Sequence, residues 1–185
     1  MKINIFGYNI FAKGGTSRSN INLVKSLLEI GHEVHYFNYQ DYNKSDITKL
    51  IIYESLSTKH LHIHQFNSGK ELAHGDLLII TRETFFNHAY LVKKINSKIK
   101  IVGEIHGPLE YINENIDLAL DCIDCVRVST ARIKNEFIAK YDYHRVFNQY
   151  VNAQHIDLKS EPINTKRNFL IKARFEDEVK DISYI

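Results

Sequence analysis

The fold of this chain follows from residues 2–39, KINIFGYNIFAKGGTSRSNINLVKSLLEIGHEVHYFNY. The opening apolar run KINIF predicts a strand, and a loop then leads to Gly14 and Gly15. The hydroxyl residues that follow predict the N-cap of a helix. Apolar residues recur at helical spacing as far as Gly31, which has the place of a C′ glycine. The closing run EVHYFNY predicts a second strand. Strand, helix and strand in this order predict a βαβ unit with a right-handed crossover.

The same alternation continues along the rest of the chain. Periodicity predicts further strands at residues 61–66, 76–81, 100–105, 125–129 and 145–151, and helices at residues 46–56, 85–95 and 131–141. Helices that alternate with short apolar strands predict an α/β fold. We expect a Rossmann-like, doubly wound, mainly parallel sheet with helices on both faces.

A change of composition near the C-terminus predicts a domain boundary. The polar segment KSEPINTKR, residues 159–167, has the character of a linker after a domain of residues 1–158. NFLIK, at the start of residues 168–185, predicts a strand that cannot bury its apolar side chains alone. We expect this strand to join the sheet, to pair with another chain, or to begin a second domain that is truncated here.

Composition narrows the class of protein. The 185 residues are 44% apolar and 25% charged, which is typical of a globular domain. The net charge is only +2 and is spread evenly over both halves, so we expect no nucleic-acid partner. No secretory signal and no apolar run of about 20 residues occurs, which predicts a cytoplasmic protein.

Two groups of residues occupy positions where ligands bind in such a fold. Gly14, Gly15 and Thr16 lie between the first strand and the first helix, where backbone amides attract an anion. The alternative is a plain tight turn, because no known nucleotide fingerprint is present. His106 ends the run IVGEI at the carboxyl edge, where an imidazole can bind a hydroxyl or carry a proton. Glu104 shares its strand face, and the alternatives there are a structural histidine and an acid paired with a lysine.

Three histidines raise the question of a metal. His60, His62 and His64 fall at every second position, which places them on one strand face. Zinc would need a further ligand, of which His74 is the nearest in sequence. The favoured interpretation is an exposed face of an edge strand, so we expect no metal site. The chain also has no D-x-D pair.

These landmarks, taken in order, resemble the retaining GT-B glycosyltransferases, in particular the family-four group of bacterial hexosyltransferases. The resemblance rests on the GGT loop, LLEIGHEV, IVGEIHG, VSTARIKNEF, RVFNQYV and NFLIKARFEDEVK. It implies the N-terminal, acceptor-side domain of an enzyme that transfers a hexose from a nucleotide-sugar to a glycan. The acceptor it favours is a cell-wall or surface polymer such as teichoic acid. The resemblance implies retention at the anomeric carbon and no cofactor or metal.

The resemblance also implies roles for individual residues. Gly14 and Gly15 match the glycine loop that lies against the donor phosphates and the acceptor. His106 matches the crevice histidine, which bonds the transferred sugar and steadies charge at the reacting carbon. Arg174 and Lys180 match a basic pair that grips the diphosphate of the donor and stabilises the leaving group without a metal.

Departures from the family pattern limit what this chain is expected to do alone. Ala173 replaces a usual glycine, and the paired-glutamate segment of the second domain does not occur. Half a cleft cannot exclude water, so we expect no transfer by the 185-residue chain itself. The alternative function is a non-catalytic Rossmann-like domain that binds a glycan or completes another subunit. Association with the inner face of a membrane and a homodimer through the C-terminal strand stay open.

Overall fold

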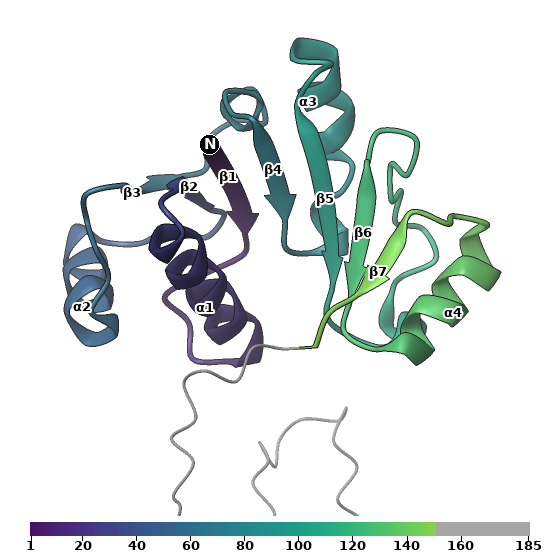
Figure 1. Cartoon of the computed structure of the whole chain (residues 1–185), viewed down its shortest axis with the longest axis horizontal. Helices are drawn as coiled ribbons and strands as arrows, with labels where there is room; N and C mark the ends of the chain where they lie inside the picture. Colours follow the sequence, from purple (N-terminus) through teal and green to yellow (C-terminus); the bar gives the residue numbers. More distant parts are fainter. Residues whose placement is uncertain (151–185) are drawn as a thin grey trace, which may run out of the picture. The chain divides into compact units, whose positions relative to one another are not determined.

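The computed structural model describes residues 1–150, in which seven strands form one sheet (Figure 1). The strands are β1 (Lys2–Gly7), β2 (Glu33–Asn38), β3 (Leu61–Gln65), β4 (Leu77–Ile80), β5 (Lys100–Ile105), β6 (Cys125–Val128) and β7 (Val146–Asn148). The helices are α1 (Gly15–Glu29), α2 (Lys44–Glu54), α3 (His88–Ile95) and α4 (Ala131–Tyr141), with short 3-10 turns η1 (Glu71–Ala73), η2 (Glu83–Phe85) and η3 (Leu109–Tyr111).

The strand order is that of a doubly wound sheet. It runs β3-β2-β1-β4-β5-β6-β7, and every neighbouring pair is parallel. The order reverses between β1 and β4, because the chain crosses over β1 after β3. The predicted Rossmann-like α/β fold is therefore confirmed, with a sheet in residues 1–150 that is parallel throughout. In such sheets the ligand crevice lies beyond the carboxyl ends of the strands at this reversal.

Two apolar cores cover the two faces of the sheet. Side chains alternate along each strand, so Ile5 of β1 faces one core while its neighbour Phe6 faces the other. The first core takes its helical contacts from α1 and α2, and the second from α3 and α4 (Figure 1). Helices therefore lie on both faces, as predicted.

Of the two caps predicted for α1, the structure has one as expected and one not. Gly31 follows the helix with a φ of 84°, which confirms its place as the C′ glycine. The predicted hydroxyl N-cap is wrong, because Gly14 is the N-cap and no side chain caps the helix. The Ser17 hydroxyl instead donates to the carbonyl of Asn9, at 2.7 Å. The Ser17 hydroxyl is therefore engaged by the Asn9 carbonyl, and the first-turn amides of α1 have no side-chain cap.

The amino ends of β5 and β6 are held by Asp124, which fixes the register of the two strands. Its carboxylate accepts from Lys93 Nζ at 2.7 Å, Lys100 Nζ at 3.0 Å and the backbone N–H of Ile101 at 2.9 Å. Burial raises the pKa of Asp124, but these hydrogen bonds outweigh it and lower the pKa to about 2.

This carboxylate makes stability depend on pH. Its pKa is lower in the folded chain than in the unfolded one, so its contribution is complete above about pH 4 and is lost as the pH falls towards 2. We expect Asp124→Asn to cost roughly 2 kcal/mol at neutral pH and almost nothing at pH 2. Urea unfolding of both proteins at several pH values measures this, and a gap that stays constant down to pH 2 would contradict it.

Gly103 of β5 lies against the ring of Phe86, which is fully buried. A Cβ at this position would stand 2.4 Å from Phe86 Cζ, and the closed core leaves the ring little room to move. We expect Gly103→Ala to lower the free energy of unfolding by about 2 kcal/mol. Gly107→Ala is the matched control, because a Cβ there meets nothing within 4 Å. Equal unfolding midpoints for the two variants would refute the steric argument.

Some predictions fall outside the described residues. These are the linker 159–167, the strand at the start of 168–185, Ala173, Arg174 and Lys180. Within residues 1–150, no helix has the length and apolar character that crossing a bilayer requires.

Candidate functional site

The carboxyl edge of the sheet gathers the predicted site residues of the described chain. Because all strands are parallel, the segments that follow β1, β4 and β5 emerge at the same edge (Figure 1). Gly14, Gly15 and Thr16 lie between β1 and α1, and His106 follows β5 directly. The expected common edge for the glycine loop and His106 is therefore confirmed, whereas their contacts with a substrate stay predictions.

His106 is held by a hydrogen bond to Glu104, whose carboxylate also faces a buried arginine. Its Nε2 lies 3.1 Å from Glu104 Oε2, and Glu104 Oε1 lies 3.7 Å from Arg127 Nη1 on the neighbouring strand β6. The carboxylate can only accept, so Nε2 of His106 carries the proton and Nδ1 is the ring atom that can accept a hydrogen bond. Nδ1 makes no hydrogen bond within residues 1–150. Glu104 thus pairs with an arginine and a histidine, not with the lysine considered above.

Arg127 is buried more deeply than the two side chains that it supports. It is 5% exposed, its Nη2 donates to the carbonyl of Gln149 at 2.8 Å, and its Nε has no partner within the described chain. The sequence analysis missed this residue. A detectable signal is the arginine in the apolar run CVRVS beside an acid in the run IVGEI, since adjacent buried strands rarely carry unpaired charges.

Hydrogen bonds also connect α1 to the sheet near the point where the strand order reverses. Asn20 Nδ2 donates to Tyr36 Oη at 2.9 Å and to Thr81 Oγ1 at 3.3 Å. Burial raises the pKa of Tyr36, and the charge of Glu104 raises it further. The hydrogen bond from Asn20 acts in the opposite direction but is the weaker effect. Asn20 Oδ1 is buried and has no partner in residues 1–150. The start of α1 is therefore positioned by hydrogen bonds as well as by apolar packing.

Gly15 is not required by the backbone. Gly31 is the glycine with positive φ in the described chain, and a Cβ added at Gly15 would meet nothing within 4 Å. Neither torsion nor crowding therefore requires a glycine at this position. An alanine here would narrow the approach to the first-turn amides without disturbing the core.

Aromatic side chains form a cluster at the same edge, the aromatic cluster: Tyr8 and Tyr39, which are exposed, and Phe85, which is buried beneath them. The ring centroids of Tyr8 and Tyr39 are 5.9 Å apart and those of Tyr39 and Phe85 4.9 Å apart. The guanidinium of Arg82 lies 5.6 Å from the centroid of the Tyr8 ring. Such a surface can stack on a sugar or a nucleobase. The sequence analysis missed it, because its members follow three different strands.

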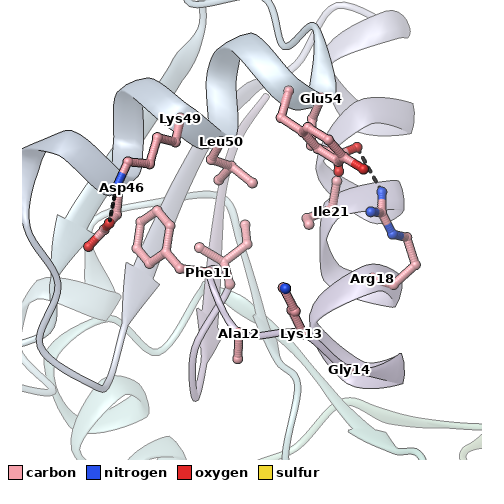
Figure 2. Close-up of a pocket in the computed structure, with 12 residues that line it drawn as sticks. Phe11, Ala12, Lys13, Gly14, Arg18, Ile21, Asp46, Lys49, Leu50 and Glu54 are labelled. Carbon is pink, nitrogen blue, oxygen red and sulfur yellow. Dashed lines mark hydrogen bonds and ion pairs between the residues drawn. The ribbon is translucent and has the colours of Figure 1, made fainter.

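A pocket of about 560 Å³ opens between the β1–α1 loop, α1 and α2 (Figure 2). Its apolar lining includes Phe11 and Leu50. Arg18 of α1 and Glu54 of α2 face one another across it, with Nη1 and Oε2 2.7 Å apart. The bond with Arg18 is the main cause that lowers the pKa of Glu54, which keeps the carboxylate ionised. The volume suits a small ligand.

The predicted row of histidines lies on β3, which is an edge strand of the described sheet, as expected. His60 precedes the strand, while His62 and His64 meet Glu33 and His35 of β2. His74 lies in the same surface groove as His64 but is not among these contacts. The sequence analysis missed the two residues of β2, because only the strand pairing brings them close.

Comparison with known proteins identifies the fold. No family model and no curated protein matches the sequence. Among solved structures, the chain is similar to an alpha-glucosyltransferase in complex with UDP and a 13-mer DNA containing a HMU base. The TM-score is 0.54 and the identity 14%, over 80% of this chain and 41% of that one. An alpha-glucosyltransferase complex with UDP and a DNA containing a central A:G mismatch gives 0.51 and 17%, over 80% and 40%.

These matches confirm a Rossmann-like domain of the GT-B type, and the chain spans about 40% of the length of either structure. The expectation that nucleic acid is no partner is contradicted, because this fold occurs in DNA-bound glucosyltransferases. The net charge of a chain is a poor predictor of nucleic-acid binding for a physical reason. It averages over the whole surface, whereas phosphate contacts require only a local basic patch.

Proposed function

We propose that this chain supplies one wall of the cleft of a nucleotide-sugar-dependent glycosyltransferase. The observation that carries the proposal is the position of His106 at the carboxyl edge of β5, where Glu104 and Arg127 hold it. The fold is that of glucosyltransferase structures that contain UDP, which supports this class of reaction. Since the chain spans about 40% of their length, we infer that transfer needs a second wall.

In this proposal His106 acts on the transferred hexose. Nδ1 accepts a hydrogen bond from a sugar hydroxyl, and the carboxylate of Glu104 keeps the ring oriented through Nε2. The glycine loop with Thr16 lies against the phosphates, and Arg174 and Lys180 bind the diphosphate, as the resemblance implies. Transfer then proceeds with retention and without a metal, as the resemblance implies.

Two acceptors fit a hydroxyl nucleophile in this position. The resemblance favours a glycan or surface polymer, whereas the solved relatives hold DNA, in one case with a HMU base. The aromatic cluster can stack on either a sugar or a base. Both acceptors would reach the crevice between the ends of β1 and β4.

The test is a transfer assay with UDP-glucose on the protein expressed from its complete reading frame and, separately, on the 185-residue chain. Acceptors are surface-polymer fragments and a duplex with a central HMU base. We expect transfer to one of them by the complete protein and none by the chain alone. Unaided transfer by the chain would overturn the inferred need for a second wall.

The alternative function, a non-catalytic binding domain, makes the opposite prediction. The complete protein would then transfer no sugar from any nucleotide-sugar, yet bind a glycan or co-purify with a second subunit. Calorimetry with the same polymer fragments, and mass measurement of the native complex, detect this outcome.

A further inference from the structure

The edge of the sheet formed by β2 and β3 carries a cluster of imidazoles that the proposed function does not use. Val34 and Tyr36 of β2 face the core under α1 and α2, so Glu33 and His35 point to the opposite face. The register places His62 of β3 directly beside His35. Glu33 is the first residue of β2, so it lies at the amino end of the strand, opposite to the carboxyl edge.

Three of these side chains converge. One potential ligand atom from each of Glu33, His35 and His62 lies within 4.8 Å of the other two. Glu33 Oε1 is 2.7 Å from His35 Nε2 and 3.8 Å from His62 Nε2. Ligands at tetrahedral zinc stand about 3.3 Å apart, since each bond is about 2.0–2.1 Å long. The observed separations bracket this value, so small side-chain rotations bring the three atoms onto one ion.

A fourth residue orients the central ligand. His35 Nδ1 lies 2.9 Å from His64 Nε2, with the two rings nearly parallel at 5°. Phe37 in turn stacks on His64, with centroids 4.9 Å apart. If His35 binds an ion through Nε2, the proton of its neutral ring is on Nδ1, where His64 accepts it. Metal-binding histidines are characteristically oriented by such a second hydrogen bond.

The charge state of the cluster suits a cation. Burial lowers the pKa of His35 and of His64, which favours the neutral form of both imidazoles. The hydrogen bond from His35 lowers the pKa of Glu33, which is therefore an anion. Among the neighbouring charges, Lys2 opposes a cation in the cluster, whereas Glu71 favours one.

We propose that Glu33, His35 and His62 bind a divalent transition-metal ion, with His64 as the positioning residue. Two imidazoles and one carboxylate favour Zn²⁺ over Mg²⁺ or Ca²⁺, which prefer oxygen ligands alone. The side chains of Glu33 and His62 are 45% and 46% exposed, so the ion has an entry path and a position for water. The ion links β2 to β3 and has no part in sugar transfer.

The test is metal binding by the full chain after removal of metals with a chelator. We expect one Zn²⁺ per chain by calorimetry, a rise of several degrees in the unfolding temperature, and visible absorption bands with Co²⁺. Glu33→Gln, His35→Gln and His62→Gln should each weaken binding by about 100-fold or more. His60→Gln and His74→Gln are matched controls, because neither residue is among the converging ligands, and both should bind as the unchanged chain does.

His64 has a separate readout. His64→Ala should weaken binding by about 10- to 100-fold with the stoichiometry unchanged. His64→Gln, which keeps an acceptor for His35 Nδ1–H, should recover part of this loss. Binding that survives His62→Gln, or that is lost equally in His60→Gln, would overturn the site. Absence of saturable Zn²⁺ and Co²⁺ binding by a folded chain would do the same.

Discussion

Arg127→Met is expected to lower the free energy of unfolding by about 3–5 kcal/mol, because it leaves the carboxylate of Glu104 buried without its cationic partner. Arg127 and Glu104 are 5% and 8% exposed, so water cannot replace the lost interaction. The carbonyl of Gln149 would also lose its donor. Methionine fills a similar volume, so the loss of stability is due to the missing charge and not to a cavity. Chemical unfolding followed by circular dichroism measures it.

Two further variants isolate the cause. Arg132→Met removes an arginine that lies closer to its partner, 2.7 Å from Glu136 against 3.7 Å between Arg127 and Glu104, but whose side chain is 87% exposed. We expect little change in the free energy of unfolding of this variant, because exposed ion pairs contribute little to stability. The double variant Glu104→Gln, Arg127→Met removes the buried charge itself and should recover part of the stability. If Arg127→Met costs no more than Arg132→Met, the buried pair does not stabilise the fold.

The order of the elements could be predicted from the sequence because it depends on local patterns. The period of apolar residues separates helices from strands, and Gly31 marks a helix end by its torsion alone. The exception is the N-cap of α1. The Ser17 hydroxyl had a second possible partner, the Asn9 carbonyl, and only the folded loop shows that this partner is nearer.

The site could be predicted only in part. A rule of parallel sheets placed His106 and the glycine loop at one edge, since each follows its own strand. Arg127 and the aromatic cluster depend on which strands and loops become neighbours, and this information is not local. Glu104 shows the difference, because its strand face was predictable while its partner on β6 was not.

The strand pairing also changes the interpretation of the histidines. Alternate residues of one strand share a face but are spaced about 6.6 Å apart, so His60, His62 and His64 alone are a poor ligand set. The register of β2 with β3 supplies His35 beside His62, and Glu33 beside both. A metal site between strands is therefore invisible to a search for spacing within one segment.

His106→Ala is expected to reduce sugar transfer by about 100- to 1,000-fold in the protein expressed from its complete reading frame, with little loss of stability. The imidazole follows β5 and belongs to neither apolar core, so its removal opens no cavity in them. If Nδ1 binds the transferred sugar as charge develops at the reacting carbon, the loss should fall on kcat and not only on KM.

His144→Ala is the matched control, because His144 also pairs with a carboxylate, Asp142 at 3.2 Å, but is 73% exposed and lies outside the crevice. Its transfer rate should equal that of the unchanged protein. If His106→Ala also retains full activity, the assigned role of His106 is wrong while the transferase proposal stands. If the unchanged protein transfers no sugar to either acceptor, the proposed function itself fails, and the binding-domain alternative becomes the better explanation of an arginine-supported histidine at the sheet edge.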